Sequence, residues 1–146
     1  MPSRLPFRRQ ETPSSCLPAC LRMVFESYGV KVSESEIRDA CDCTMLGTFA
    51  WAAVDAARSF GFVGTRKHTL SLSELVRLVA EGKYPVVLLS LKPIDGIRET
   101  HAVVVVAADD ETVTVLDPMK GGRTLAAAVF RMAWALRESV AIIVSR

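Results

Sequence analysis

The chain has 146 residues, half of them hydrophobic, which is enough for one globular domain with a substantial core. Its formal net charge is only +2, too small to indicate binding to nucleic acid or to an acidic membrane surface. The basic start, Met1 to Gln10, is not followed by an uninterrupted apolar stretch, so no signal peptide is predicted. The longest apolar run, Ala102 to Ala108, has the length of a strand and not of a membrane span. We therefore expect a cytoplasmic protein with a single domain, residues 1–146, and no membrane segment.

Helix signals cluster in the first half of the chain. The first predicted helix runs from about Cys16 to Tyr28, with Ser15 as its cap, Pro18 in its first turn and Gly29 at its end. Capping residues and terminal glycines predict three further helices, which begin after Ser33, Thr48 and Ser71 and end near Cys41, Ser59 and Gly82.

The pattern changes after Lys83. Runs rich in valine, leucine and isoleucine predict strands at 85–91, 101–108, 112–117 and 139–146. The second and third of these are joined by a short polar loop, which predicts an antiparallel hairpin. Residues 124–136 are predicted to be helical. Helices first and strands later indicate an α+β fold, in which N-terminal helices pack on a C-terminal antiparallel β-sheet.

Two histidines are present, and they lie in different surroundings. His68 is set among polar residues and is interpreted as a solvated strand residue. His101 opens a very apolar strand, and Asp117 ends the next strand, immediately before Pro118. The two ends meet in an antiparallel hairpin, so His101 and Asp117 are predicted to be neighbours. A turn-forming Asp-Pro and a structural histidine are the alternatives.

Cys16 occupies the first turn of the first predicted helix, where free backbone N–H groups and the helix dipole favour a thiolate. Cys20 lies one turn further, on the apolar face, and is interpreted as a core residue. These positions predict a triad with Cys16 as nucleophile, His101 as base and acid, and Asp117 orienting the imidazole. The backbone N–H of Cys16 and the side chain of Gln10 are candidate oxyanion donors.

The order of these residues resembles a known family. The first part of the shared pattern is a glutamine, a cysteine that opens a helix, an Ala-Cys pair and a Tyr-Gly end, here Gln10, Cys16, Ala19-Cys20 and Tyr28-Gly29. The later part consists of glycines around a helix, a proline-bearing strand, a histidine before valines, an Asp-Pro and an aromatic-bearing helix, here Gly47, Gly61-Phe62, Pro85, His101–Val106, Asp117-Pro118, Phe130 and Trp134. The chain thus resembles, over nearly all its length, the peptidase C39-like family of papain-fold cysteine peptidases. That family includes the peptidase domains of bacteriocin-exporting ABC transporters.

The resemblance implies a papain-like fold and a peptidase reaction that needs no metal or organic cofactor. It assigns the oxyanion-hole side chain, nucleophile, general base and orienting acid to Gln10, Cys16, His101 and Asp117. Leu17 departs from the family, which often has glycine there, and its side chain either narrows the cleft or points into the core. The expected partner is a peptide or protein substrate, for example a precursor peptide associated with an exporter. If the sequence ending at Arg146 is complete, a stand-alone domain is expected.

Other functions are compatible with parts of this pattern. An acyl- or amidotransferase would use the same thioester, and a silent module of the same fold would only bind peptides. A zinc site from the four cysteines is disfavoured, because paired zinc-binding cysteines usually have two to four residues between them, whereas Cys41 and Cys43 have only one. A redox pair of Cys16 and Cys20 is disfavoured because such pairs have the C-x-x-C spacing.

Overall fold

The computed structural model describes residues 5–146 of the chain. The first four residues of the basic N-terminal segment therefore lie outside the described residues. The first half contains the helices α1 (Cys16–Ser27), α2 (Glu34–Ala40), α3 (Ala50–Ser59) and α4 (Leu72–Ala80) and the short strand β1 (Arg66–Thr69). The second half contains β2 (Val86–Ser90), α5 (Lys92–Asp95), β3 (Thr100–Ala108), β4 (Thr112–Asp117), β5 (Gly121–Ala126), α6 (Ala127–Ala135) and β6 (Val140–Ile143). No helix in this described range is both long enough and apolar enough to cross a bilayer.

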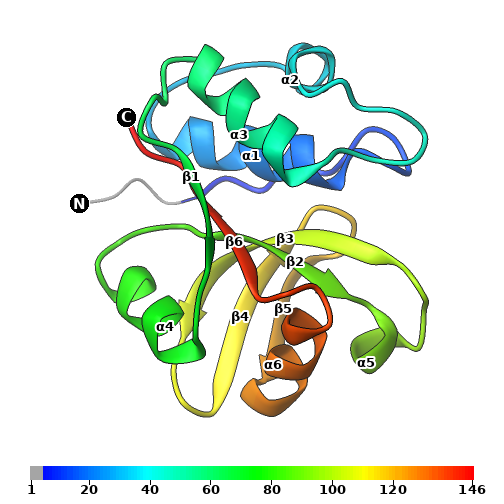
Figure 1. Ribbon diagram of the computed structural model, residues 1–146, viewed down its shortest axis with the longest axis vertical. Coiled ribbons are helices and arrows are strands. Elements are labelled where there is room, and N and C mark those ends of the chain that lie inside the picture. Colours follow the sequence, from blue (N-terminus) through cyan, green and yellow to red (C-terminus); the bar gives the residue numbers. More distant parts are fainter. Residues whose placement is uncertain (1–4) are drawn as a thin grey trace.

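The strands form one antiparallel sheet in the order β1-β6-β2-β3-β4-β5. Helices α1, α2 and α3 cover one face of the sheet, and α4 and α6 cover the other (Figure 1). The α+β class is confirmed. The prediction placed the N-terminal helices on the sheet, and the structure adds that helices cover both of its faces (Figure 1).

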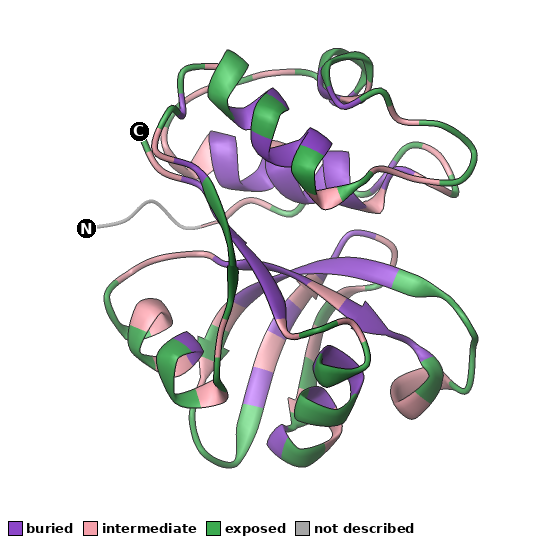
Figure 2. Ribbon diagram, viewed as in Figure 1, coloured by how far each residue is buried: buried purple, intermediate pink, exposed green. Residues whose placement is uncertain are grey.

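Each face of the sheet has its own apolar core. Side chains alternate along a strand, so Val104 packs with the cluster that contains α1, whereas Val103 packs with the cluster that contains α6. Figure 2 shows the buried residues concentrated in α1 and in the central strands, and an exposed edge strand β1. Burying a large apolar side chain contributes roughly 1.5–3 kcal/mol, so these two clusters fix the helices on the sheet.

Helix α1 begins at Cys16 and is closed by Gly29, which has a φ of 81°. The predicted bounds are therefore confirmed. The predicted cap is wrong, because the Ser15 hydroxyl makes no capping hydrogen bond even though Ser15 occupies the N-cap position. The prediction that Thr48 caps α3 is also wrong, since Phe49 stands at that N-cap and no side chain caps the helix.

The two other predicted caps are found in the structure. Ser71 and Glu74 form both hydrogen bonds of a capping box at the start of α4. At the start of α2, Ser33 accepts from the Glu36 N–H at 3.1 Å. The Glu36 carboxylate accepts the Ser33 hydroxyl at 3.2 Å. In a capping box it would accept the Ser33 backbone N–H instead.

The predicted hairpin of β3 and β4 is confirmed. Its register pairs Val104 with Leu116 and shifts between Val105 and Ala107, where a bulge adds a residue. The helix predicted for residues 124–136 is wrong at its start, because β5 extends through Ala126 and α6 begins only at Ala127. Pairing with β4 outweighs the helix propensity of the alanines in this segment.

Candidate active site

Cys16 lies at the first residue of α1 and remains partly exposed. Helix geometry leaves the first backbone N–H groups without intrahelical partners, and these groups carry the positive end of the helix dipole. The Cys16 Sγ also accepts the backbone N–H of Ala102, at 3.5 Å. The start of β3 therefore presents a backbone donor to this sulfur, which lies at the positive end of the helix.

The His101 imidazole contacts the Asp117 carboxylate. Nε2 of His101 and Oδ1 of Asp117 are 2.7 Å apart, and both side chains are almost completely buried. The same carboxylate oxygen accepts the backbone N–H groups of Met119 at 2.8 Å and Lys120 at 3.3 Å. The turn after β4 thus fixes the carboxylate, and the carboxylate in turn fixes the plane of the imidazole.

The electrostatics of this pair favour a charged imidazolium. Burial alone would lower the pKa of His101, but hydrogen bonds to Asp117 and Cys16, together with the charges of these groups, raise it to about 9. Burial would raise the pKa of Asp117, but the hydrogen bond to His101, its charge and the two backbone donors hold that pKa below its ordinary value. Nε2 is occupied by Asp117, so the ring has Nδ1 left for Cys16.

Gln10 lies in the segment that leads into α1 and is almost fully buried. Its backbone N–H donates to the carbonyl of Pro118 at 2.9 Å, directly after Asp117. Its side-chain Nε2 donates to the Thr12 carbonyl at 2.8 Å. One N–H of that amide is therefore used inside the loop, and the second remains for another acceptor. The structure ties Gln10 to the turn of Asp117 but does not place it among the residues that line the cleft.

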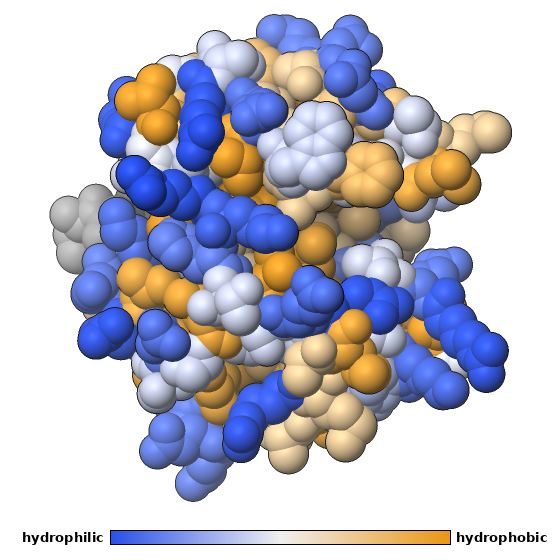
Figure 3. Space-filling view, viewed as in Figure 1, coloured by the Kyte–Doolittle hydropathy of each residue, from blue (hydrophilic) through white to orange (hydrophobic). Residues whose placement is uncertain are grey.

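A cleft with a volume of about 830 Å³ brings three of the four predicted residues together. Cys16, His101 and Asp117 all line it, with walls from the loop after α2 and from the segment that joins β2 to β3. Figure 3 shows apolar side chains gathered over the loop between α2 and α3, at the upper right. We call the exposed apolar residues of this region the apolar shoulder: Met45, Leu46, Phe49 and Trp51.

Leu17 does not narrow the cleft. Its side chain is 2% exposed and packs in the core under α1. Of the two outcomes considered for this departure from the family pattern, the structure shows the one in which Leu17 points into the core.

The other cysteines lie in different environments from Cys16. Cys20 and Cys41 are buried, and burial is the main cause that raises the pKa of both thiols, to about 12 for Cys41. Cys43 is partly exposed and lies 3.7 Å from the carbonyl oxygen of Ser14. Across residues 5–146, no three His, Cys, Asp or Glu side chains are grouped so that they could hold a metal ion.

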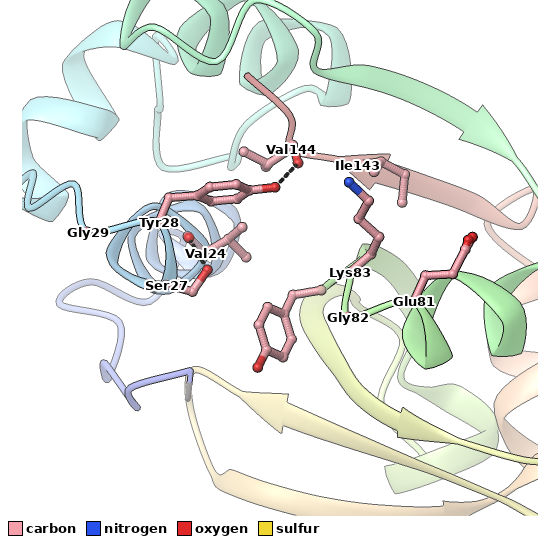
Figure 4. Close-up of a pocket in the computed structure, with 10 residues that line it drawn as sticks. Val24, Ser27, Tyr28, Gly29, Glu81, Gly82, Lys83, Ile143 and Val144 are labelled. Atoms are coloured by element: carbon pink, nitrogen blue, oxygen red, sulfur yellow. Dashed lines mark hydrogen bonds between the residues drawn. The ribbon is translucent and has the colours of Figure 1, made fainter. Parts of the chain in front are cut away.

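A second cavity, of about 340 Å³, lies between the end of α1 and the loop after α4 (Figure 4). The Tyr28 hydroxyl donates to the Val144 carbonyl at 3.0 Å on one side of it, and Lys83 lies on the other. Neither histidine and none of the cysteines lines this cavity. His68 is exposed on β1, as predicted. The larger cleft is therefore the one that a cysteine and a histidine both line.

Two features of the site had no signal in the sequence. The Ala102 N–H is a backbone donor, and no side-chain pattern indicates which backbone group will face a sulfur. Arg123 lies on β5, a strand that was not predicted, and its guanidinium donates to the Asp95 carboxylate at 2.8 and 3.0 Å. The same group lies 3.7 Å from Oδ2 of Asp117, and it therefore links the turn after β2 to the buried carboxylate.

Known proteins resemble this chain in sequence and in fold. A sequence model described as the peptidase C39 family matches residues 4–146. A protein of unassigned function from Methanothermobacter marburgensis is 31% identical over 114 residues, which cover 77% of this chain and 71% of that protein.

Two solved structures show the same fold. The peptidase domain of Streptococcus ComA, a bifunctional ABC transporter involved in a quorum-sensing pathway, aligns with a TM-score of 0.78 and 23% identity over 98% of this chain and 100% of that one. A double-glycine-motif protease from an AMS/PCAT transporter, solved in complex with a leader peptide, aligns with a TM-score of 0.78 and 19% identity over 97% of this chain and 91% of that one. The papain-like fold predicted from the sequence is therefore confirmed.

Proposed function

Because the chain belongs to the peptidase C39 family, we propose that it is a cysteine peptidase that cleaves a peptide or protein substrate through a thioester on Cys16. One observation carries the proposal. Cys16, His101 and Asp117 line the same cleft, and the last two are joined by a 2.7 Å hydrogen bond. A histidine held by a buried carboxylate beside a cysteine at a helix start is an arrangement suited to nucleophilic catalysis.

The first chemical step is attack by the Cys16 thiolate on a peptide carbonyl carbon. The proton of the thiol resides on His101, whose raised pKa of about 9 keeps the imidazolium charged at neutral pH. That imidazolium donates its proton to the leaving amine when the C–N bond breaks. Water then attacks the thioester, with His101 acting as base, and the free thiol and a carboxylic acid are the products.

The tetrahedral intermediate carries a negative charge on the former carbonyl oxygen. The backbone N–H of Cys16 is available at the helix start, and the unused N–H of the Gln10 side chain is the proposed second donor. Removing one such donor costs about a hundredfold to a thousandfold in kcat in other enzymes. The proposed roles of Gln10 and Cys16 therefore account for a large part of the catalysis.

The surroundings of the cleft support a peptide substrate. Met45 and Leu46 line the cleft and are 94% and 99% exposed, and the rings of Phe49 and Trp51 stack beside them, with centroids 6.2 Å apart. Exposed apolar patches of this kind mark interaction surfaces. We propose that the apolar shoulder binds apolar side chains of a precursor peptide, as the fold similarity to a leader-peptide-bound protease suggests.

The test is incubation of the protein with a synthetic precursor peptide that contains a double-glycine motif and an apolar segment before it. We expect hydrolysis after the paired glycines, because a protease of the same fold, solved with its leader peptide, acts at a double-glycine motif. Mass spectrometry of the products gives the bond that is cut, and acid quenching traps the acyl-enzyme as a mass increase on Cys16.

The products also separate the alternatives. Transfer of the acyl group to an added amine, with little hydrolysis, would identify a transferase that uses the same thioester. Tight binding of the peptide with neither an acyl-enzyme nor a product would identify a binding module and contradict the proposal.

A further inference from the structure

Glu34 is a carboxylate whose side chain has no exposed surface. Fully buried acids are rare unless they are paired. Its Oε2 accepts Nη1 of Arg38 at 2.8 Å, within α2. Its Oε1 accepts the backbone N–H of Glu11 at 3.0 Å and lies 3.2 Å from the Ser15 hydroxyl. One carboxylate oxygen therefore belongs to the helix, and the other belongs to the segment immediately before Cys16.

The segment held by Glu34 also holds Gln10. Ser15 Oγ accepts the Thr12 N–H at 3.0 Å, and the Thr12 carbonyl accepts Nε2 of Gln10 at 2.8 Å. A continuous set of hydrogen bonds thus runs from Glu34 through Ser15 and Thr12 to the Gln10 amide. The other end of the segment is fixed by the hydrogen bond between the Gln10 N–H and the carbonyl of Pro118.

Glu34 also affects the start of α1. A serine at the N-cap ordinarily accepts an N–H from the first turn of its helix. Ser15 makes no such bond, because its hydroxyl is engaged with Thr12 and Glu34. Pro18 has no N–H, so the backbone amides of Cys16 and Leu17 are the two that remain uncapped. A capping serine would compete with an oxyanion for the Leu17 N–H.

We propose that Glu34 is a positioning residue of the active site, which holds residues 10–15 so that the Gln10 amide and the first amides of α1 are presented to the oxyanion. This inference rests on the proposed peptidase function and deepens it. Glu34 touches no reacting atom and acts through Glu11 and Ser15. A displacement of catalytic groups by about 1 Å can cost about a hundredfold in rate, so the loop must be held closely.

The test compares Glu34→Ala with Glu34→Gln in the double-glycine peptide assay. Alanine removes the acceptor of the Glu11 N–H, and we expect kcat to fall about tenfold to a hundredfold while KM changes less than about threefold. Glutamine keeps an oxygen acceptor and the shape of the side chain, and should restore most of kcat. The matched control is Glu36→Gln, an exposed acid on the same helix, which should behave like the wild type.

A second readout separates positioning from simple loss of structure. Alkylation of Cys16 by iodoacetamide forms no oxyanion, so its rate in folded Glu34→Ala should stay within about twofold of wild type. If Glu34→Ala does not fold, Ser15→Ala removes only the hydroxyl, and a fall in kcat of about tenfold is expected.

Unchanged kcat in the folded variants, or an alkylation rate that falls as much as kcat, would overturn the inference. A wild-type protein that does not turn over the peptide would instead overturn the peptidase function, and this inference with it.

Discussion

Replacing Cys16 with alanine should abolish peptide turnover, with a loss of at least about a thousandfold, whereas Cys20→Ala should keep most of it. Cys16 is partly exposed in the cleft and receives the Ala102 N–H, whereas Cys20 is fully buried one turn deeper in α1. Burial raises the pKa of Cys20, so this thiol stays protonated and out of reach of a substrate. The measurement is the initial rate of product formation with the double-glycine peptide.

The control for this comparison is Cys43→Ala, because Cys43 is a partly exposed cysteine that does not line the cleft. It should turn over peptide at the wild-type rate. Cys20→Ala removes buried volume and should cost about 1 kcal/mol or somewhat more in the free energy of unfolding, so each variant is assayed below its melting temperature. Equal losses in the Cys16 and Cys20 variants would show that no single cysteine is the nucleophile.

Asp117→Asn is expected to lower kcat by about a thousandfold to ten-thousandfold, as the loss of an orienting acid does in other triads. Asp117 holds Nε2 of His101 at 2.7 Å and contributes to the pKa of about 9 of the imidazole. Asparagine removes the negative charge, so the pKa of His101 falls and the protonated form is lost at lower pH. The measurement is kcat as a function of pH, from about pH 6 to about pH 10.

The direction of the shift follows from the role of the proton. In the wild type, kcat should fall as the pH rises through about 9, because the imidazolium then loses the proton that the leaving amine requires. In Asp117→Asn this fall should occur at lower pH. The control is Glu111→Gln, an exposed acid just before β4 that does not line the cleft and should change neither kcat nor the pH profile. An Asp117→Asn variant with the wild-type pH profile would contradict the proposed pairing.

The residue pattern was sufficient to predict the main elements around the site. The cysteine at the start of α1, with proline in the first turn and glycine at the end, marks a helix whose bounds the structure confirms. The hairpin of β3 and β4 follows from two apolar runs and a short polar loop, and this hairpin brings His101 to Asp117. The catalytic roles of these residues remain predictions that the experiments above address.

The remaining features depend on contacts that are distant in sequence. Strand β5 has only exposed and half-buried residues, so no buried apolar run marks it in the sequence. It forms because β4 pairs with it along its whole length. Ser15 has the residue type and position of a cap, yet its hydroxyl bonds Thr12 and Glu34 instead. Such competition between local and tertiary hydrogen bonds cannot be read from a single segment.

The central claim is that Cys16 is a nucleophile activated by His101, and alkylation tests it most directly. The protein is treated briefly with iodoacetamide at mildly acidic pH, where ordinary thiols are protonated, and the four cysteines are mapped by mass spectrometry. Cys16 should be labelled first, well before the partly exposed Cys43, and His101→Ala should lower its rate to that of Cys43. Equal labelling of Cys16 and Cys43 in the wild type would contradict the activated nucleophile.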